Sequence, residues 1–117
     1  MKPLSRKRRL IENEVIFRDV NESIEEFLVE NGSKNKLALF YCECSRPNCI
    51  ERINLSPNEY GKIHKDKKRF VILSGHEFPE VEKVIKKTSH YQVVEKYFKP
   101  PKAKDIEPAL KNISVRV

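Results

Sequence analysis

Apolar residues recur at helical spacing through the first quarter of the chain. Six positions follow one another at alternating intervals of three and four residues: Leu10, Asn13, Phe17, Val20, Ile24 and Phe27. Ile16 and Leu28 widen this stripe, and most of the acidic residues between positions 12 and 30 fall on the opposite face. The pattern predicts an amphipathic helix over residues 8–30 that ends at Gly32, which can adopt the left-handed conformation of a helix cap.

The apolar stripe of this helix has two candidate partners. One is a sheet of the same domain, which we prefer because the repeat covers only about three heptads. The other is the same helix of a second copy, or a surface of another protein. That alternative rests on the coiled-coil-like spacing, with the polar Asn13 at an inner position.

Two strands are predicted on either side of a turn that holds all the cysteines. Residues 36–42 and 50–55 are rich in apolar and β-branched side chains. A short helix is predicted to follow the second strand. Ser56 can cap this helix, Pro57 suits its first position, and Glu59 completes a capping box.

The second half of the chain has the pattern of a small antiparallel sheet. Residues 70–73 form a short apolar run, and residues 81–86 and 91–96 read as the two arms of a hairpin. From residue 99 to residue 117 the chain becomes rich in Pro and Lys and is predicted to be extended. We therefore expect an α+β fold, in which a long N-terminal amphipathic helix packs on a small antiparallel sheet.

Length and charge divide the chain into three parts. A chain of 117 residues, 38% hydrophobic and 35% charged, fits one domain with a small core. The net charge of +7 is uneven: residues 1–9 carry +5, residues 10–31 carry −6 and residues 32–117 carry +8. We accordingly predict a basic arm at 1–9, a single domain at 10–98 and a tail at 99–117.

The excess of positive charge suggests a polyanionic partner. Basic surfaces attract phosphate backbones by counterion release, so DNA or RNA is a reasonable partner class. The candidate contacts lie in two basic runs: Arg6, Lys7, Arg8, Arg9, Lys65, Lys67, Lys68 and Arg69. The alternative is that these side chains only keep a small protein in solution. No helix-turn-helix or paired zinc-finger pattern is present, so sequence-specific recognition is not expected.

The chain has three cysteines, and they cluster within eight residues as Cys42, Cys44 and Cys49. In an extended strand the side chains of Cys42 and Cys44 leave the same face, and the Pro47-Asn48 turn can bring Cys49 back toward them. Zn²⁺ favours thiolate ligands in a tetrahedral arrangement. The spacing therefore predicts a structural Zn²⁺ site in a loop resembling a zinc knuckle, and such a metal would support a small core.

The fourth ligand is expected to be His76. This histidine follows a predicted strand and Gly75, so its imidazole could approach the cysteine loop from a neighbouring sheet position. His64 and His90 are the rival ligands, and we expect both to be exposed to solvent.

Two other interpretations of the cysteines stay open. They could form a reactive redox centre, or they could be ordinary buried thiols, since free cysteine is among the most buried residue types. No signal-peptide pattern or membrane-length apolar stretch is present, so the cytoplasm is the expected compartment. In a reducing compartment, clustered cysteines favour metal ligation over disulfides.

No catalytic arrangement stands out in the sequence. Zinc deaminases combine a His-x-Glu element with a later Pro-Cys-x₂-Cys element, and here the order, the spacing and the adjacency all differ. Glu43 and Glu77 flank the candidate ligands, but each is read more simply as a solvated carboxylate or one that supports a ligand. We therefore expect a protein that is not an enzyme.

Several motifs occur together between residues 13 and 97: Phe17-Arg18-Asp19-Val20-Asn21-Glu22, Cys42-Glu43-Cys44, Leu55-Ser56-Pro57-Asn58-Glu59-Tyr60, Gly75-His76-Glu77 and Tyr91-Gln92-Val93-Val94-Glu95-Lys96. In these motifs the chain resembles a family of small, uncharacterised bacterial proteins. The resemblance implies a bacterial or phage-like cytoplasmic protein in which the cysteines and the Gly-His-Glu element form one unit. Similar proteins tend to have Gly and Asp after the second cysteine, where this chain has Ser45 and Arg46.

Together these patterns predict a small zinc-binding module that binds nucleic acid or a ribonucleoprotein. One alternative is a regulatory adaptor that binds proteins, or a second copy of itself, through the acidic N-terminal helix. The other alternative is a thiol-based redox sensor.

Overall fold

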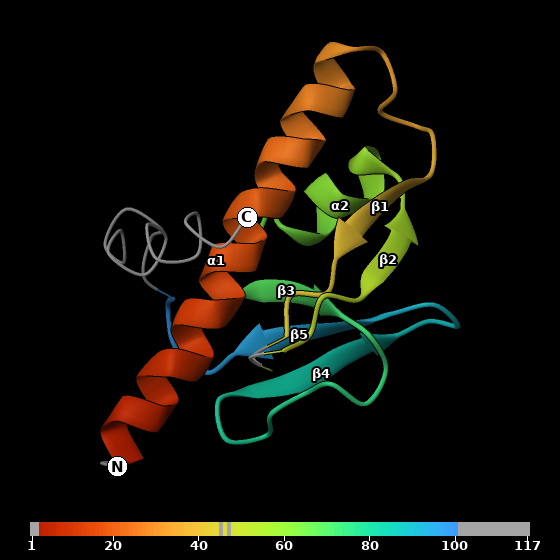
Figure 1. Ribbon diagram of the computed structural model, residues 1–117. Helices are drawn as coiled ribbons and strands as arrows, with labels where there is room; N and C mark the ends of the chain where they lie inside the picture. The colour runs from red at the N-terminus through yellow and green to blue at the C-terminus, as the bar shows by residue number, and fades with distance from the viewer. Residues whose placement is uncertain (1–2, 45, 47, 101–117) are drawn as a thin grey trace.

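The computed structural model describes residues 3–44, 46 and 48–100, with side chains from residue 12 onward. Within these residues the predicted α+β class is confirmed: two helices pack with two small antiparallel sheets (Figure 1). The elements in chain order are α1 (Pro3–Glu30), β1 (Ala38–Tyr41), β2 (Arg52–Leu55), α2 (Pro57–Ile63), β3 (Arg69–Ile72), β4 (Glu82–Lys87) and β5 (Gln92–Lys96). From residue 101 onward, the predicted extended tail lies outside the described residues.

Helix α1 ends where the sequence predicts. Gly32 has a φ of 76°, the left-handed conformation that glycine adopts without a steric penalty. The amide of Ser33 donates to the carbonyl of Leu28 at 2.8 Å, and the amide of Gly32 donates to that of Val29 at 3.1 Å. These two bonds form a Schellman cap and satisfy carbonyls that would otherwise lack partners.

The first sheet pairs β1 with β2 on either side of the cysteine loop. Ala38 pairs with Leu55 and Phe40 with Ile53 in an antiparallel register. Phe40, Ile53 and Leu55 are buried on one face, whereas Leu39 is exposed on the other. The alternation is that of a strand pair with one face in the core.

The second sheet has the order β3-β5-β4, with β5 in the middle. Phe70 pairs with Val94 and Val71 with Val93 between β3 and β5, and β4 and β5 form the predicted hairpin. A β-bulge between Val84 and Lys86 shifts the register of the β4–β5 pair. The central strand is buried over most of its length, which explains its run of β-branched residues.

Helix α2 begins at the predicted capping box. The Ser56 hydroxyl oxygen accepts a hydrogen bond from the amide of Glu59 at 3.2 Å, and Pro57 occupies the first turn. Tyr60 is fully buried from this helix, and its ring stacks on Phe40 with centroids 4.6 Å apart. The helix thereby covers the first sheet. None of the helices in the described part of the chain is both long and apolar enough to cross a membrane.

The apolar stripe of α1 packs on the body over only part of its length. Ile16 is buried and Phe17 contacts the ring of Tyr41, with centroids 5.8 Å apart. Val20 and Phe27 instead remain 37% and 63% exposed. The expectation that the stripe packs on the domain's own sheet is therefore right for its middle and wrong at Val20 and Phe27, because polar residues occupy the buried face there.

Polar side chains attach α1 to the first sheet. The carboxamide of Asn21 accepts a bond from the amide of Tyr41 and donates one to its carbonyl, both at 2.8 Å. Arg18 donates to the carbonyl of Lys67 at 2.8 Å and lies over the ring of Phe70. These contacts satisfy backbone groups at the edge of each sheet and fix the rotation of the helix.

A buried ion cluster attaches the N-terminal half of α1 to the second sheet. Lys96 on β5 donates to Glu14 on α1 and, at 2.5 Å, to Glu82 on β4, and none of the three side chains is exposed. Burial, together with the adjacent Glu82, raises the pKa of Glu14 well above its ordinary value, although Lys96 opposes this. The cluster therefore places one lysine between two carboxyl groups, and burial favours the protonated form of Glu14.

Candidate metal centre

Four side chains from two separate loops converge at one point. Cys42, Cys44 and Cys49 come from the loop between β1 and β2, and His76 comes from the loop after β3. Their ligand atoms all lie within 4.8 Å of one another. The structure thus brings together the four predicted ligands, and they could hold a metal ion.

Local backbone bonds shape the cysteine loop. The amide of Cys42 donates to the carbonyl of Glu51 at 2.8 Å, which continues the β1–β2 pairing up to the first ligand. The amide of Cys49 donates to the carbonyl of Arg46 at 3.2 Å. This bond closes a turn that brings the Cys49 thiol back toward the other two thiols. The loop is thus the connection of a hairpin, as the sequence predicts.

A tight turn after β3 places the histidine. Gly75 has a φ of 86°, and the amide of His76 donates to the carbonyl of Leu73 at 3.1 Å. A residue with a Cβ would be strained at this position. Gly75 therefore lets the chain reverse directly after the strand and directs the imidazole toward the thiols.

Two of the distances between candidate ligand atoms match those around a tetrahedral ion. Nδ1 of His76 lies 3.7 Å from Sγ of Cys42 and 3.7 Å from Sγ of Cys49. A tetrahedral Zn²⁺ with Zn–S of about 2.3 Å and Zn–N of about 2.0 Å separates its ligand atoms by roughly 3.5–3.8 Å. The donor set of three sulfurs and one nitrogen also matches the ligands that this ion prefers.

Each sulfur accepts a backbone N–H group. The amide of Leu73 donates to Cys42 at 3.2 Å, and the amides of Arg46 and Glu51 donate to Cys44 and Cys49. Such donors stabilise thiolates, which are the ligating form of cysteine.

The thiols of the cysteine loop differ in the direction of their pKa shifts. The Cys42 thiol, followed by His76, lowers the pKa of Cys44 to about 5. For Cys42 the direction is opposite: the hydrogen bond with Cys44 and the burial of the Cys42 thiol raise its pKa. Cys44 is thus the sulfur that is favoured to ionise first.

The centre is buried on one side and open on the other. All three cysteines are buried, but Cys49 and the partly buried His76 also line a surface groove with Arg46, Asn48 and Glu51. A metal can therefore enter from the side of Cys49. The four protein ligands would fill a tetrahedral shell, which is typical of structural sites.

Glu43, between the first two cysteines, is a buried structural residue that the sequence interpretation missed. Its side chain points away from the thiols and accepts bonds from Nε2 of His64 at 2.7 Å, the Tyr60 hydroxyl at 2.6 Å, Nδ2 of Asn21 at 3.0 Å and the amide of Val71 at 2.9 Å. The expectation of a solvated carboxylate is thus wrong for Glu43. Alternation between Cys42 and Cys44 was the available signal, because a residue between two inward side chains points the other way.

His64 is also buried, so the expectation that it is exposed is wrong. Its Nδ1 lies 2.9 Å from the carbonyl of Tyr60, and its Nε2 meets Glu43. Both ring nitrogens face acceptors, so the imidazole carries two protons and a positive charge. His64 is therefore the ion-pair partner of Glu43 and is not a metal ligand, whereas His90 is exposed as expected.

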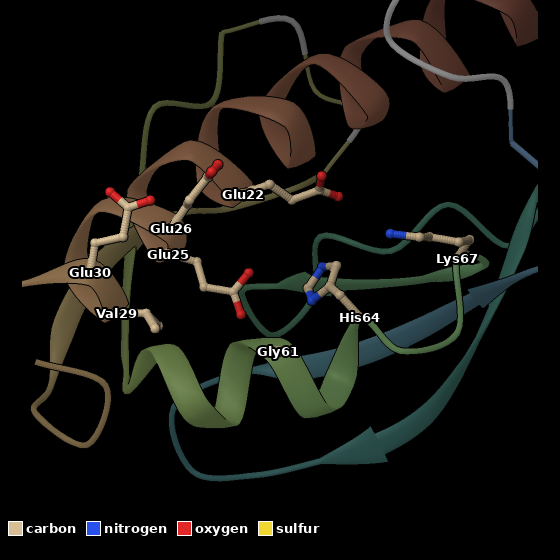
Figure 2. Close-up of a pocket in the computed structure, with 8 residues that line it drawn as sticks. All are labelled: Glu22, Glu25, Glu26, Val29, Glu30, Gly61, His64 and Lys67. Atoms are coloured by element: carbon tan, nitrogen blue, oxygen red, sulfur yellow. The ribbon is translucent and has the colours of Figure 1, made fainter. Parts of the chain in front are cut away.

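A groove between α1 and α2 has His64 in its lining (Figure 2). It has a volume of about 600 Å³ and is mostly acidic, being lined by Glu22, Glu25, Glu26, Val29, Glu30, Gly61, His64 and Lys67. Burial raises the pKa of Glu25, which lies against Gly61 at the floor of the groove. His64 forms part of the wall, but both of its nitrogens are already bonded.

The basic residues that were candidates for nucleic-acid contacts are in different environments. Lys65 is exposed, Lys67 borders the acidic groove, and Lys68 is partly buried. Arg69 is paired with Glu95 at 3.3 Å and Asp66 at 3.8 Å. Arg6, Lys7, Arg8 and Arg9 lie on the first turns of α1, and their side chains are outside the described residues.

Comparisons with known proteins identify no relative: no protein-family model, curated protein or solved structure matches this chain.

Proposed function

We propose that the protein is a small zinc-binding module, in which Zn²⁺ has a structural role and a surface of the domain binds a partner. The convergence of Cys42, Cys44, Cys49 and His76 within 4.8 Å carries this proposal. The sulfur-rich donor set and the backbone amides directed at the sulfurs support Zn²⁺ as the metal.

The candidate ligands come from parts of the chain that are far apart in the sequence. The cysteine loop belongs to the β1–β2 hairpin, whereas His76 follows β3 in the other sheet. Zn²⁺ held by both loops would join the two sheets. Because ligands from distant segments assemble only in the folded chain, metal binding would add directly to folding stability.

The test is metal analysis of protein purified without chelator. We expect about one equivalent of Zn²⁺ per chain and a higher melting temperature than after chelation. His76→Asn and Cys49→Ser should each weaken Zn²⁺ binding by at least about tenfold. His90→Asn is the matched control, because His90 is an exposed histidine outside the site.

Three outcomes would contradict this proposal. If the protein is purified metal-free and added Zn²⁺ does not change its melting temperature, Zn²⁺ has no structural role. Equal Zn²⁺ affinity in His76→Asn and His90→Asn would contradict the assignment of His76 as the fourth ligand. A metal-free protein whose thiols react at once with iodoacetamide would favour the redox alternative.

For the partner, we propose nucleic acid bound through phosphate contacts. Support comes from the net charge of +7, the four basic residues at positions 6–9 and exposed lysines on the edge strand β4, namely Lys83, Lys86 and Lys87. The lysines on the edge strand also discourage edge-to-edge aggregation, so the same charges can have both roles. Fluorescence anisotropy with a labelled oligonucleotide at increasing salt tests this proposal.

Phosphate contacts should produce a steep, linear fall of log affinity with log salt. Neutralising positions 6–9 with glutamine should reduce the magnitude of that slope by roughly three to four, if each side chain meets one phosphate. Lys34→Gln and Lys36→Gln are control variants outside both surfaces. No binding to DNA or RNA at low salt would exclude nucleic acid as the partner.

A further inference from the structure

The three thiols of the candidate metal centre differ in their access to solvent. Cys49 lines the polar surface groove, which has a volume of about 370 Å³ and is formed with Arg46, Asn48, Glu51 and His76. Cys42 and Cys44 are not part of that lining, and only 1% of each residue is exposed, against 8% of Cys49. A small polar reagent that enters the groove therefore meets the Cys49 sulfur first.

The strand register places Cys44 opposite Cys49. The amide of Cys42 donates to the carbonyl of Glu51 at 2.8 Å, which continues the β1–β2 register by one residue. Two further residues in the same antiparallel register bring Cys44 across from Cys49. Directly opposed residues have Cα atoms about 4.5–5.5 Å apart, a separation that a disulfide can span. The two sulfurs already lie within 4.8 Å of each other.

The buried thiols are held more firmly than the thiol at the groove. The carboxylate of Glu43, which lies between Cys42 and Cys44, accepts hydrogen bonds from α1, α2 and β3 in the core. Cys49 lies instead on a turn at the surface, closed by the 3.2 Å bond to the carbonyl of Arg46. Cys49 is thus the candidate ligand that can approach a second sulfur with the least disruption of the core.

On the basis of the Zn²⁺ site proposed above, we propose that Cys49 is a peroxide-sensitive ligand whose oxidation opens the site through a disulfide with Cys44. The Cys49 thiolate attacks one oxygen of hydrogen peroxide, the O–O bond breaks, and the hydroxide that leaves is protonated to water. The Cys44 thiolate then attacks the sulfur of the Cys49 sulfenic acid. The S–S bond forms as the S–O bond breaks, and the second hydroxide is also protonated to water. Two electrons pass from the two sulfurs to the peroxide.

The disulfide would remove two of the four ligands. Cys42 and His76 remain, and two ligands hold Zn²⁺ much more weakly than a complete tetrahedral shell. The ion is then released, and the link that it provides between the cysteine loop and the loop after β3 is lost. Thiol–disulfide exchange with a reductant reverses the step.

The test treats the Zn²⁺-loaded full chain with an equimolar amount of hydrogen peroxide. A chromogenic chelator measures the metal released, and tandem mass spectrometry after alkylation locates the disulfide. We expect release of about one equivalent of Zn²⁺ per chain, a disulfide between Cys44 and Cys49, and an alkylated Cys42. Dimedone added during the reaction should be found on Cys49, because it traps sulfenic acids.

A variant that keeps all four ligands tests the groove as the route of attack. Asn48→Trp places an indole ring in the groove and should slow Zn²⁺ release at least about threefold, with unchanged Zn²⁺ affinity. Ile50→Trp is the matched control, because Ile50 follows Cys49, is 74% exposed and does not line the groove.

Metal analysis before oxidation separates this proposal from the one on which it rests. A chain that contains no Zn²⁺ at that stage contradicts the zinc site itself. A loaded chain that keeps its Zn²⁺ in excess peroxide overturns the peroxide step alone. So does a first dimedone adduct on Cys42 or Cys44, a disulfide that includes Cys42, or equal rates of release from Asn48→Trp and Ile50→Trp.

Discussion

The carboxylate of Glu43 and the imidazole of His64 form an ion pair, 2.7 Å apart, in the interior of the domain. Glu43 lies between two of the proposed metal ligands, and His64 lies at the end of α2 beside the acidic groove. Hydrogen bonds from Tyr60, Asn21 and Val71 complete the coordination of the carboxylate. The geometry of the cysteine loop is therefore coupled to α1, α2 and β3.

Replacing the carboxylate of Glu43 should strongly lower the free energy of unfolding. Glu43→Gln keeps the shape but removes the charge and directs an NH₂ group at groups that are themselves donors. Breaking a buried ion pair in this way costs about 3–5 kcal/mol of unfolding free energy. Urea unfolding of Zn²⁺-saturated protein measures the loss. Glu51→Gln, at an exposed position in the same loop, should change stability by less than about 0.5 kcal/mol.

The Tyr60 hydroxyl offers a smaller test of the same cluster. Tyr60→Phe removes the hydroxyl, which lies 2.6 Å from the Glu43 carboxylate and 3.3 Å from the carbonyl of Arg18. Hydrogen bonds to charged groups contribute about 1.5–3 kcal/mol, so the variant should lose that amount. Tyr97→Phe is the matched control, because Tyr97 is exposed. Equal stability of the two variants would show that the bond contributes nothing.

Stability should also depend on pH through His64. Burial and the charge of Arg18 favour the neutral ring, but the Glu43 carboxylate outweighs them and raises the pKa of His64 above its ordinary value of 6.5. A raised pKa in the folded state gives stability that is fully present below pH 6.5 and is lost as the pH rises through the folded value.

The measurement compares wild-type and His64→Gln proteins, both saturated with Zn²⁺, from pH 6.5 upward. The stability difference between them should shrink as the pH rises, whereas effects common to both, such as ionisation of cysteines in the unfolded chain, cancel. A difference that is constant with pH, or that grows, would contradict the assignment of a charged His64.

The buried cluster around Lys96 should respond non-additively to substitution. Either Glu14 or Glu82 can balance the lysine charge, and burial already favours a neutral Glu14. Glu14→Gln should therefore cost less than about 1 kcal/mol, and Glu82→Gln should be partly compensated by ionisation of Glu14. The double variant leaves Lys96 unpaired and should cost about 3–5 kcal/mol. Unfolding free energies that simply add would exclude this sharing of charge.

Local features of the fold were predictable because the signals are local. Gly32 ends α1 with a positive φ, and Ser56 and Glu59 form the capping box of α2. Turn and cap residues act through their own backbone conformation, so their sequence spacing suffices. The same holds for the cysteine loop, where Cys42 and Cys44 follow directly after β1 and bring their sulfurs close together.

The choice of His76 as the fourth candidate ligand was a weaker inference, because it depends on how the two sheets pack against each other. His64 and His90 were rivals of His76, and spacing alone does not separate three histidines from different elements. The sheet arrangement places the turn after β3 against the cysteine loop, through the bond from the amide of Glu43 to the carbonyl of Val71 at 2.8 Å. This contact joins residues that are far apart in the chain.

The sequence by itself determined the elements, the α+β class and the clustering of the three cysteines, because periodicity and turn chemistry act over a few residues. Only the tertiary structure decided which face of α1 is buried, and it buried Glu14, Arg18 and Asn21 while leaving Phe27 exposed. Charged residues are rarely buried unless they are paired, and Lys96, the partner of Glu14, comes from a strand that is distant in the sequence. The pairing of Glu43 with His64 was hidden for the same reason.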